Sequence, residues 1–333
     1  MRSASARLGL VLLVIGVSDA GAAQVRMSFL NNKQALQDTV GILDHAGCPR
    51  AVGISLQKAV DRYGAEPVKL DLSRFPVASN GFYEFPSAAV LVKSLPQSLF
   101  LVEHGGTISC LDTVVLLTMG QLRTTLEIDS SGGPFTVACH ATNGVLYGYC
   151  PAATPRDVWD AFETPWHTRE CETVFPPSVE RQHVCINAAL RCCAPLPCSG
   201  STNVSADVIG EALHWNWRRD GVVFPAKCEI VMCHAVMGTP PWRTVELLHA
   251  GVLFPRHGHF TYVEKAGLSG PFVRLDLERK EDLVVWLEAL LAGLADLGYS
   301  DYFASFNDSK PIVLRVRQVP HQAPPESQAA SKQ

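Results

Sequence analysis

Cysteine placement constrains the fold of this chain more than any other feature of its sequence. Seven of its eleven cysteines lie between residues 126 and 204, in a stretch that also contains eight prolines. Proline-rich sequence with many cysteines is typical of loops that disulfide bonds hold together. We therefore expect residues 126–204 to form a disulfide-rich insertion, and the rest of the chain to supply the hydrophobic core.

The N-terminal residues indicate the compartment in which such disulfides would form. Arg2 and Arg7 flank the start of a ten-residue apolar run, Leu8–Val17, and small residues follow it as far as Ala23. This order is typical of a secretory signal peptide, and the apolar run is too short for a membrane anchor. We expect residues 1–23 to be removed and the mature protein to be secreted or periplasmic.

Composition restricts the class of partner. The chain is 47% hydrophobic and 18% charged, and its formal net charge is −4 without any run of basic residues. Nucleic acids and anionic membrane surfaces select clustered Lys and Arg, so neither is an expected partner. No apolar stretch after the signal approaches the eighteen residues of a membrane span. We expect a folded globular protein with no membrane span after signal cleavage.

Hydrophobic periodicity divides the remainder into two folded parts and a tail. Residues 24–125 are predicted to be mainly helical, because apolar residues recur at helical spacing in 31–45, 54–63 and 107–121. Residues 205–318 are predicted to form an antiparallel sheet part, in which alternating segments at 260–264 and 272–277 indicate a hairpin. The tail, 319–333, is rich in Pro, Ser, Gln and Ala and is predicted to be disordered.

Cys110 is the candidate nucleophile. It follows a glycine-containing approach, His104–Ser109, and opens the predicted apolar helix, which Thr107 or Ser109 can cap. A thiol in the first turn of a helix meets the positive end of the helix dipole and free backbone N–H groups, which favour the thiolate. An odd number of cysteines in an oxidising compartment leaves one unpaired. The alternative is that Cys110 is a buried small hydrophobe or half of a disulfide.

His259 is the candidate general base. It comes directly before an alternating strand and follows Gly251–Pro255, which we interpret as a loop. If the hairpin turns at 266–270, Asp276 lies opposite residues 259–260. A carboxylate there can accept the ring N–H of His259 and fix its tautomer. The alternative is that both residues are solvated strand positions.

A helix-head cysteine, a strand-head histidine and a polar residue on the next antiparallel strand follow in the order of papain-like cysteine hydrolases. The sequence resembles most their NlpC-type bacterial branch, in which a segment similar to Gly251–Phe254 precedes the histidine. The resemblance implies an α+β fold with the nucleophile on a helix N-terminus packed on an antiparallel sheet. It also implies a thiol protease or amidase that cleaves peptide or peptidoglycan-stem amides.

The resemblance assigns roles to four residues: Cys110 as nucleophile, His259 as general base, Asp276 as orienting residue and His104 as oxyanion donor. It implies no cofactor. Two other interpretations remain open. The protein can be a non-enzymatic, disulfide-stabilised binding or structural protein. It can also be a metal-binding protein that uses the Cys and His residues between 228 and 259.

Overall fold

A computed structural model describes residues 25–63, 80–95, 109–126, 204–237, 243–266, 271–292 and 299–316, with the short segments 128–129, 136–137, 185–186, 189–190 and 194–195. The predicted signal peptide, most of the predicted insertion and the predicted tail lie outside these residues.

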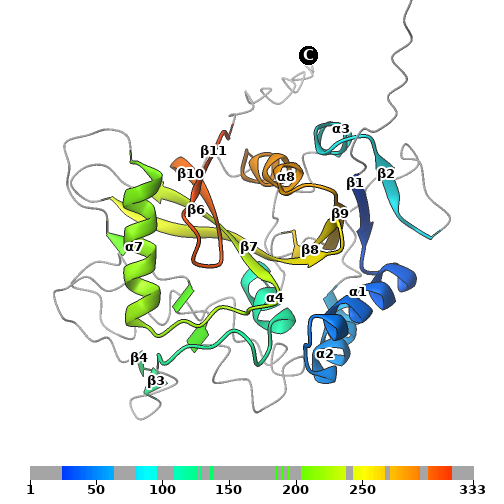
Figure 1. Cartoon of the computed structure of the whole chain (residues 1–333), viewed down its shortest axis with the longest axis horizontal. Helices are drawn as coiled ribbons and strands as arrows, with labels where there is room; N and C mark the ends of the chain where they lie inside the picture. Colours follow the sequence, from blue (N-terminus) through cyan, green and yellow to red (C-terminus); the bar gives the residue numbers. More distant parts are fainter. Residues whose placement is uncertain are drawn as a thin grey trace, which may run out of the picture.

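An antiparallel sheet of nine strands forms the centre of the described structure (Figure 1). Eight strands follow the order β11-β10-β6-β7-β8-β9-β1-β2, and β5 pairs with β7. Their bounds are β1 Val25–Phe29, β2 Tyr83–Phe85, β5 Ala194–Pro195, β6 Glu229–Met237, β7 Thr244–Arg256, β8 His259–Lys265, β9 Phe272–Leu277, β10 Ser300–Phe306 and β11 Ile312–Leu314. A separate pair consists of β3 Ile128–Asp129 and β4 Thr136–Val137.

Helices cover both faces of this sheet. Their bounds are α1 Lys33–His45, α2 Arg50–Tyr63, α3 Ala88–Ser94, α4 Cys110–Leu117, α7 Ala206–Arg219 and α8 Lys280–Ala292. One hydrophobic core joins the sheet to α1, α2, α4 and α7, and a second joins it to α3 and α8. Figure 1 shows α3 and α8 on one side of β7, β8 and β9, and α4 with α1 and α2 on the other. Mixed helical and antiparallel-sheet architecture, as predicted, is confirmed.

Two elements of the sheet differ from the sequence-based expectation. Residues 24–125 contribute β1 and β2, and β1 pairs with β9, so this part shares one sheet with 205–318. Residues 251–255, interpreted above as a loop, belong to the long strand β7. Val252, Leu253 and Phe254 are buried there, because β7 lies in the middle of the sheet and both of its faces are covered, whereas Pro255 is exposed near the end of the strand. The predicted hairpin strands are confirmed as β8 and β9.

Helix α4 is the element that positions the candidate nucleophile. Every residue from Leu111 to Leu117 is buried, and five of these seven are Leu or Val, as expected of a helix inside a protein and not on its surface. Packing of α4 against β7 and β8 therefore places the start of the helix within the molecule, beside the two central strands (Figure 1).

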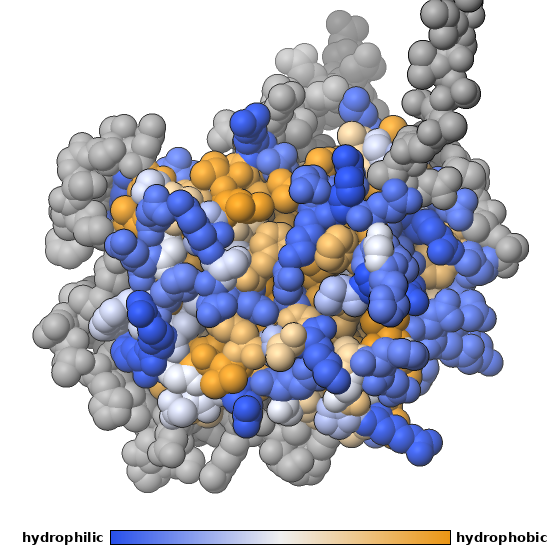
Figure 2. Space-filling model, viewed as in Figure 1, coloured by the Kyte–Doolittle hydropathy of each residue, from blue (hydrophilic) through white to orange (hydrophobic). Residues whose placement is uncertain are grey.

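The surface of the described residues shows no large apolar area on the face in Figure 2, where hydrophobic residues lie in separate places among hydrophilic ones. Within the described part of the chain, none of the helices has the length and apolar character that a membrane span needs.

Candidate active site

Cys110 is the first residue of α4, and the start of this helix is fixed by a capping box. The Ser109 hydroxyl accepts from the backbone N–H of Asp112 (3.0 Å), and the Asp112 carboxylate accepts from the backbone N–H of Ser109 (2.8 Å). Ser109 and Asp112 are both buried, whereas Cys110 is partly exposed. The cap thus holds the thiol at a defined place, with solvent access, at the positive end of the helix.

His249 is the residue that the structure brings to Cys110. It lies on β7, directly opposite Cys233 of β6, at a point where the β6–β7 register shifts. Its ring hydrogen-bonds to the side chain of Cys110. On its other side, Nε2 of His249 lies 2.6 Å from Oε2 of Glu264. One imidazole therefore connects the thiol to a carboxylate.

The charge on His249 follows from these two contacts. Only 3% of the residue is exposed, and burial by itself would lower the pKa of its imidazole. The charges of Glu264 and Cys110, with their hydrogen bonds, outweigh burial and raise the pKa of His249 to about 10. The ring is therefore an imidazolium at neutral pH.

A second buried histidine shows what the carboxylate does. His234 on β6 is 1% exposed, and its Nε2 meets the Ser305 hydroxyl at 3.2 Å. With no charged group as a cause of any shift, burial lowers the pKa of His234 to about 3. Two histidines that are equally buried thus differ in charge, because only His249 has a carboxylate as its hydrogen-bond partner.

Glu264 is held on both of its oxygens. It lies on β8 opposite Gly251 of β7, and none of the residue is exposed. Oε2 faces His249, and Oε1 accepts a hydrogen bond of 2.8 Å from the indole Nε1 of Trp286 on α8. A buried carboxylate is stable when it is paired and hydrogen-bonded, and Glu264 satisfies both conditions.

Two titratable side chains and one glycine surround this network. Cys233 and Tyr262 are fully buried, and burial followed by the charge of Glu264 raises the pKa of each well above its usual value. Both are therefore neutral at neutral pH. The Tyr262 hydroxyl lies near the Glu264 carboxylate but lacks the geometry of a regular hydrogen bond within the described residues. Gly251 is in direct contact with the Tyr262 ring and leaves no room for a Cβ atom.

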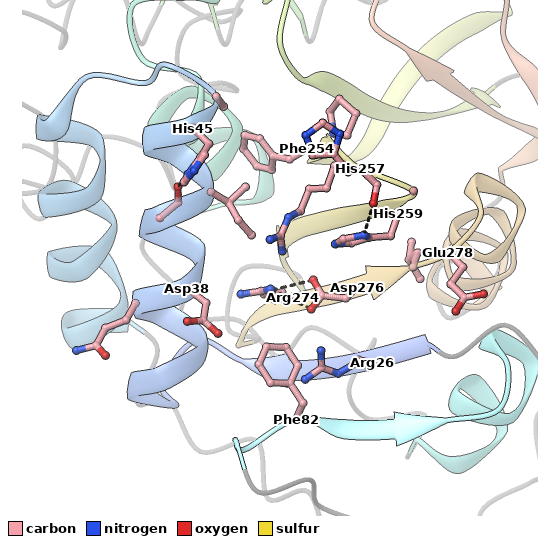
Figure 3. Close-up of a pocket in the computed structure, with 18 of the residues that line it drawn as sticks. Arg26, Asp38, His45, Phe82, Phe254, His257, His259, Arg274, Asp276 and Glu278 are labelled. Carbon is pink, nitrogen blue, oxygen red and sulfur yellow. Dashed lines mark hydrogen bonds and ion pairs between the residues drawn. The ribbon is translucent and has the colours of Figure 1, made fainter.

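His259 and Asp276 lie at the other end of the β7–β8 pair. His259 pairs with Arg256, seven residues along β7 from His249, which corresponds to about 23 Å of strand. Nδ1 of His259 donates to the backbone carbonyl of His257 (3.0 Å), at the rim of a cleft of about 1280 Å³ (Figure 3). The structure does not bring His259 to Cys110.

Asp276 has partners other than His259. Its two oxygens accept from Nε and Nη2 of Arg274 at 3.0 and 2.9 Å, and Oδ1 also accepts from the Thr261 hydroxyl at 2.8 Å (Figure 3). It pairs in register with Thr261 and not with residues 259–260, so the predicted register was off by one residue. Arg274 lies two residues before Asp276 on β9, so both side chains are on the same face of the sheet, and the Arg274 guanidinium and the Thr261 hydroxyl bind the carboxylate there. His104, the fourth predicted site residue, lies outside the described residues.

The disulfide prediction is contradicted for the cysteines that the structure describes. None of these five, Cys48, Cys110, Cys185, Cys228 and Cys233, is in a disulfide. Cys48, Cys228 and Cys233 pack in the hydrophobic cores, where a thiol behaves as a small apolar side chain. Burial raises the pKa of Cys228 to about 12 and that of Cys48 above its usual value. The parity argument therefore does not single out Cys110; its hydrogen bond to His249 does. The six other cysteines lie outside the described residues.

The interpretation of 228–259 as a metal cluster finds no matching geometry. Among the described residues, no group of three or more His, Cys, Asp or Glu side chains is arranged to hold a metal ion. Cys233 and His234 are neighbours on β6 and belong to opposite faces of the sheet: Cys233 lies in the core with α8, whereas His234 packs near Trp217 of α7.

Sequence reasoning missed His249 and Glu264 because the strand that carries His249 was interpreted as a loop. The available signal was a histidine inside the apolar run Leu247–Phe254, together with a glutamate that follows the alternating residues Thr261–Val263. Ionisable side chains inside two apolar strands are rarely buried without a partner. This rule predicts that each of the two residues has a partner, whereas the identity of that partner depends on the strand register.

Comparison with known proteins identified no relative: no protein-family model, no curated protein and no solved structure matches the chain.

Proposed function

We propose that this protein is a cysteine hydrolase in which Cys110 is the nucleophile, His249 the acid–base group and Glu264 the orienting carboxylate. The observation that carries the proposal is the position of His249, hydrogen-bonded to Cys110 on one side and 2.6 Å from Glu264 on the other. A nucleophile, a base and a third group that orients the base are the parts that acyl-transfer chemistry requires. The proposal includes a papain-like arrangement of these parts, in which a helix-head cysteine meets two antiparallel strands.

Two features favour the reactive form of Cys110. The first turn of α4 presents positive partial charge, and the neighbouring imidazolium adds a full positive charge. Both stabilise a thiolate. Of the three side chains, only that of Cys110 is partly exposed, whereas His249 and Glu264 are buried. The proposed nucleophile is thus the member of the three that retains exposed surface, while the groups that activate it are buried.

The same helix start provides donors for the oxyanion. The capping box engages the N–H of Asp112, and the N–H groups of the first helical residues, Cys110 and Leu111, point along the axis out of the helix. A carbonyl oxygen that gains negative charge during attack by Cys110 would meet these donors.

The proposed reaction is the hydrolysis of an amide. The Cys110 thiolate attacks the carbonyl carbon, and a C–S bond forms while the carbonyl oxygen becomes an oxyanion. The His249 imidazolium donates its proton to the amide nitrogen, the C–N bond breaks, and the amine leaves. Neutral His249 then takes a proton from a water molecule that attacks the thioester. The C–S bond breaks, a carboxylic acid leaves, and thiolate and imidazolium are restored.

Substrate class and location follow from the sequence and belong to the proposal. The papain-like resemblance favours peptide or peptidoglycan-stem amides, and the predicted signal peptide, residues 1–23, favours a secreted or periplasmic protein.

An activated ester tests the proposal. With p-nitrophenyl acetate in excess, we expect a burst of about one equivalent of p-nitrophenol per protein, followed by slower turnover. Cys110→Ala should lose the burst, whereas Cys228→Ser should keep it, because the Cys228 thiol is buried and protonated. Mass spectrometry after mild iodoacetamide treatment should find the label on Cys110. A folded Cys110→Ala protein that releases the same burst would overturn the proposal.

A further inference from the structure

Trp286 connects helix α8 to the proposed site. The side chain is fully buried, and its indole Nε1 donates to Oε1 of Glu264 at 2.8 Å. The other carboxylate oxygen, Oε2, faces His249 at 2.6 Å. One carboxylate oxygen of Glu264 is therefore bonded to the histidine and the other to the tryptophan.

Two fixed oxygens define the plane of the carboxylate. With only the His249 contact, the carboxylate could rotate about its last torsion, which is soft in glutamate. The indole bond removes that freedom and keeps Oε2 aimed at Nε2 of the imidazole. Hydrogen bonds to an ionised carboxylate are also stronger than neutral ones, so the indole stabilises the charge of the buried Glu264 side chain.

The chemistry of indole suits this task. Its N–H is a donor only and does not titrate, so it can hold a carboxylate without exchanging a proton with it. The nearby Tyr262 hydroxyl does not make a regular hydrogen bond to Glu264 within the described residues. Of the neighbours that the structure describes, Trp286 is thus the one that donates a well-formed hydrogen bond to Oε1.

We infer that Trp286 is a positioning residue for the proposed cysteine hydrolase, which acts by fixing Glu264 so that the carboxylate holds His249 in its charged, thiol-facing orientation. The inference rests on the proposed function. It makes the packing of α8 a determinant of reactivity at Cys110, through Glu264 and His249.

The test replaces the indole with a ring that lacks the donor. Trp286→Phe should slow iodoacetamide alkylation of Cys110 at pH 7 by about tenfold, which corresponds to the loss of one hydrogen bond to a charged group. The pH at which alkylation rises should move upward, because a less well-held imidazolium stabilises the Cys110 thiolate less. Cys233 and Tyr262 stay neutral over this range and do not contribute to the change.

A matched control separates positioning from packing. Trp217 on α7 is also buried, at 3% exposure, but packs against Phe224 and His234 and not against Glu264. Trp217→Phe should cost stability like Trp286→Phe and leave the alkylation profile of Cys110 in place. Equal profiles for the two variants would overturn the inference.

A double-mutant cycle distinguishes failure of this inference from failure of the proposed function. In a Glu264→Gln background, Trp286→Phe should cause no further loss, because its effect passes through the carboxylate. Additive losses would mean that Trp286 acts by packing alone. If His249→Asn leaves the alkylation of Cys110 unchanged, the proposed function itself fails, whatever the Trp286 variant does.

Discussion

Two pairs of a histidine and a carboxylate lie along strands β7, β8 and β9, and the groups that surround the two pairs differ. We call His249 with Glu264 the inner end, and His259 with Asp276 the outer end. At the inner end, His249 and Glu264 are buried and bonded to each other at 2.6 Å. At the outer end, His259 lies at the rim of a cleft, and Asp276 is bonded to Arg274 (Figure 3). Residue types are alike at both ends; their partners are not.

Partners determine which end can do chemistry. Asp276 makes a strong bidentate pair with Arg274. A carboxylate whose charge is neutralised by a guanidinium stabilises a nearby imidazolium only weakly. Among the described residues, Glu264 is hydrogen-bonded to His249 and Trp286, and of these two only His249 can carry a positive charge. Only the inner end also meets the start of α4 and its cysteine.

Replacing the two histidines one at a time breaks this comparison most directly. His249→Asn should reduce the alkylation rate of Cys110 at pH 7 by about 30-fold, because without the imidazolium only about 3% of an ordinary thiol is thiolate at this pH. His259→Asn should leave the rate unchanged, since its ring bonds only to the His257 carbonyl within the described residues. Alkylation kinetics with mass-spectrometric assignment measure both rates. The opposite ranking would restore His259 as the base.

Sequence alone could predict the helix and strands that carry this site, but not which of their side chains contact one another. The capping residue and apolar pattern of α4 place Cys110 at a helix start, and alternation predicts β8 and β9, because both signals are local. Which histidine meets the thiol depends on the register of β6, β7 and β8, which are separated along the chain. A strand that is buried on both faces has a nearly continuous apolar sequence without alternation. In β7 this sequence surrounds His249, so alternation did not identify the strand that carries it.

The predicted disulfides failed for a related reason. A count of cysteines gives a parity but no position, and the described thiols of Cys48, Cys228 and Cys233 lie in hydrophobic cores. In such places a cysteine is chosen for its size and polarity. Export of the chain stays a prediction, since residues 1–24 lie outside the described structure.

Replacing each of the two carboxylates by an amide should have a different main effect: Glu264→Gln should reduce reactivity, and Asp276→Asn should reduce stability. Glu264→Gln leaves burial as the main influence on His249, so its pKa falls below the ordinary value and Cys110 alkylation at pH 7 drops about tenfold or more. Asp276→Asn leaves the buried Arg274 guanidinium without its counter-charge and should cost about 3 kcal/mol of unfolding free energy. Alkylation rates and urea unfolding measure the two effects. Loss of reactivity in Asp276→Asn at full stability would contradict this division of roles.

The free energy of unfolding should depend on pH through the protonation of His249 at the inner end. Because the pKa of His249 is raised from 6.5 to about 10, its contribution to stability is full below pH 6.5 and is lost as pH rises toward 10. His234 acts in the opposite direction: with a pKa of about 3, it costs stability as pH falls below 6.5. Urea unfolding across this range should show an alkaline decline that His249→Asn removes. An unchanged decline in that variant would mean that His249 is not charged in the folded protein.

Two glycines allow the smallest test, because each end of the β7–β8 pair has one. A Cβ atom on Gly251 would collide with the buried Tyr262 ring, beside Glu264, so Gly251→Ala should cost about 1–3 kcal/mol and slow Cys110 alkylation. Gly258, in the outer turn, has open space around it but a φ of +79°, so Gly258→Ala should cost only about 1 kcal/mol of backbone strain and leave the alkylation rate unchanged. Thermal unfolding and alkylation kinetics compare the two variants. If Gly251→Ala loses stability but keeps its rate, the Tyr262 ring can move without disturbing Glu264, and the inner end is less tightly packed than its contacts indicate.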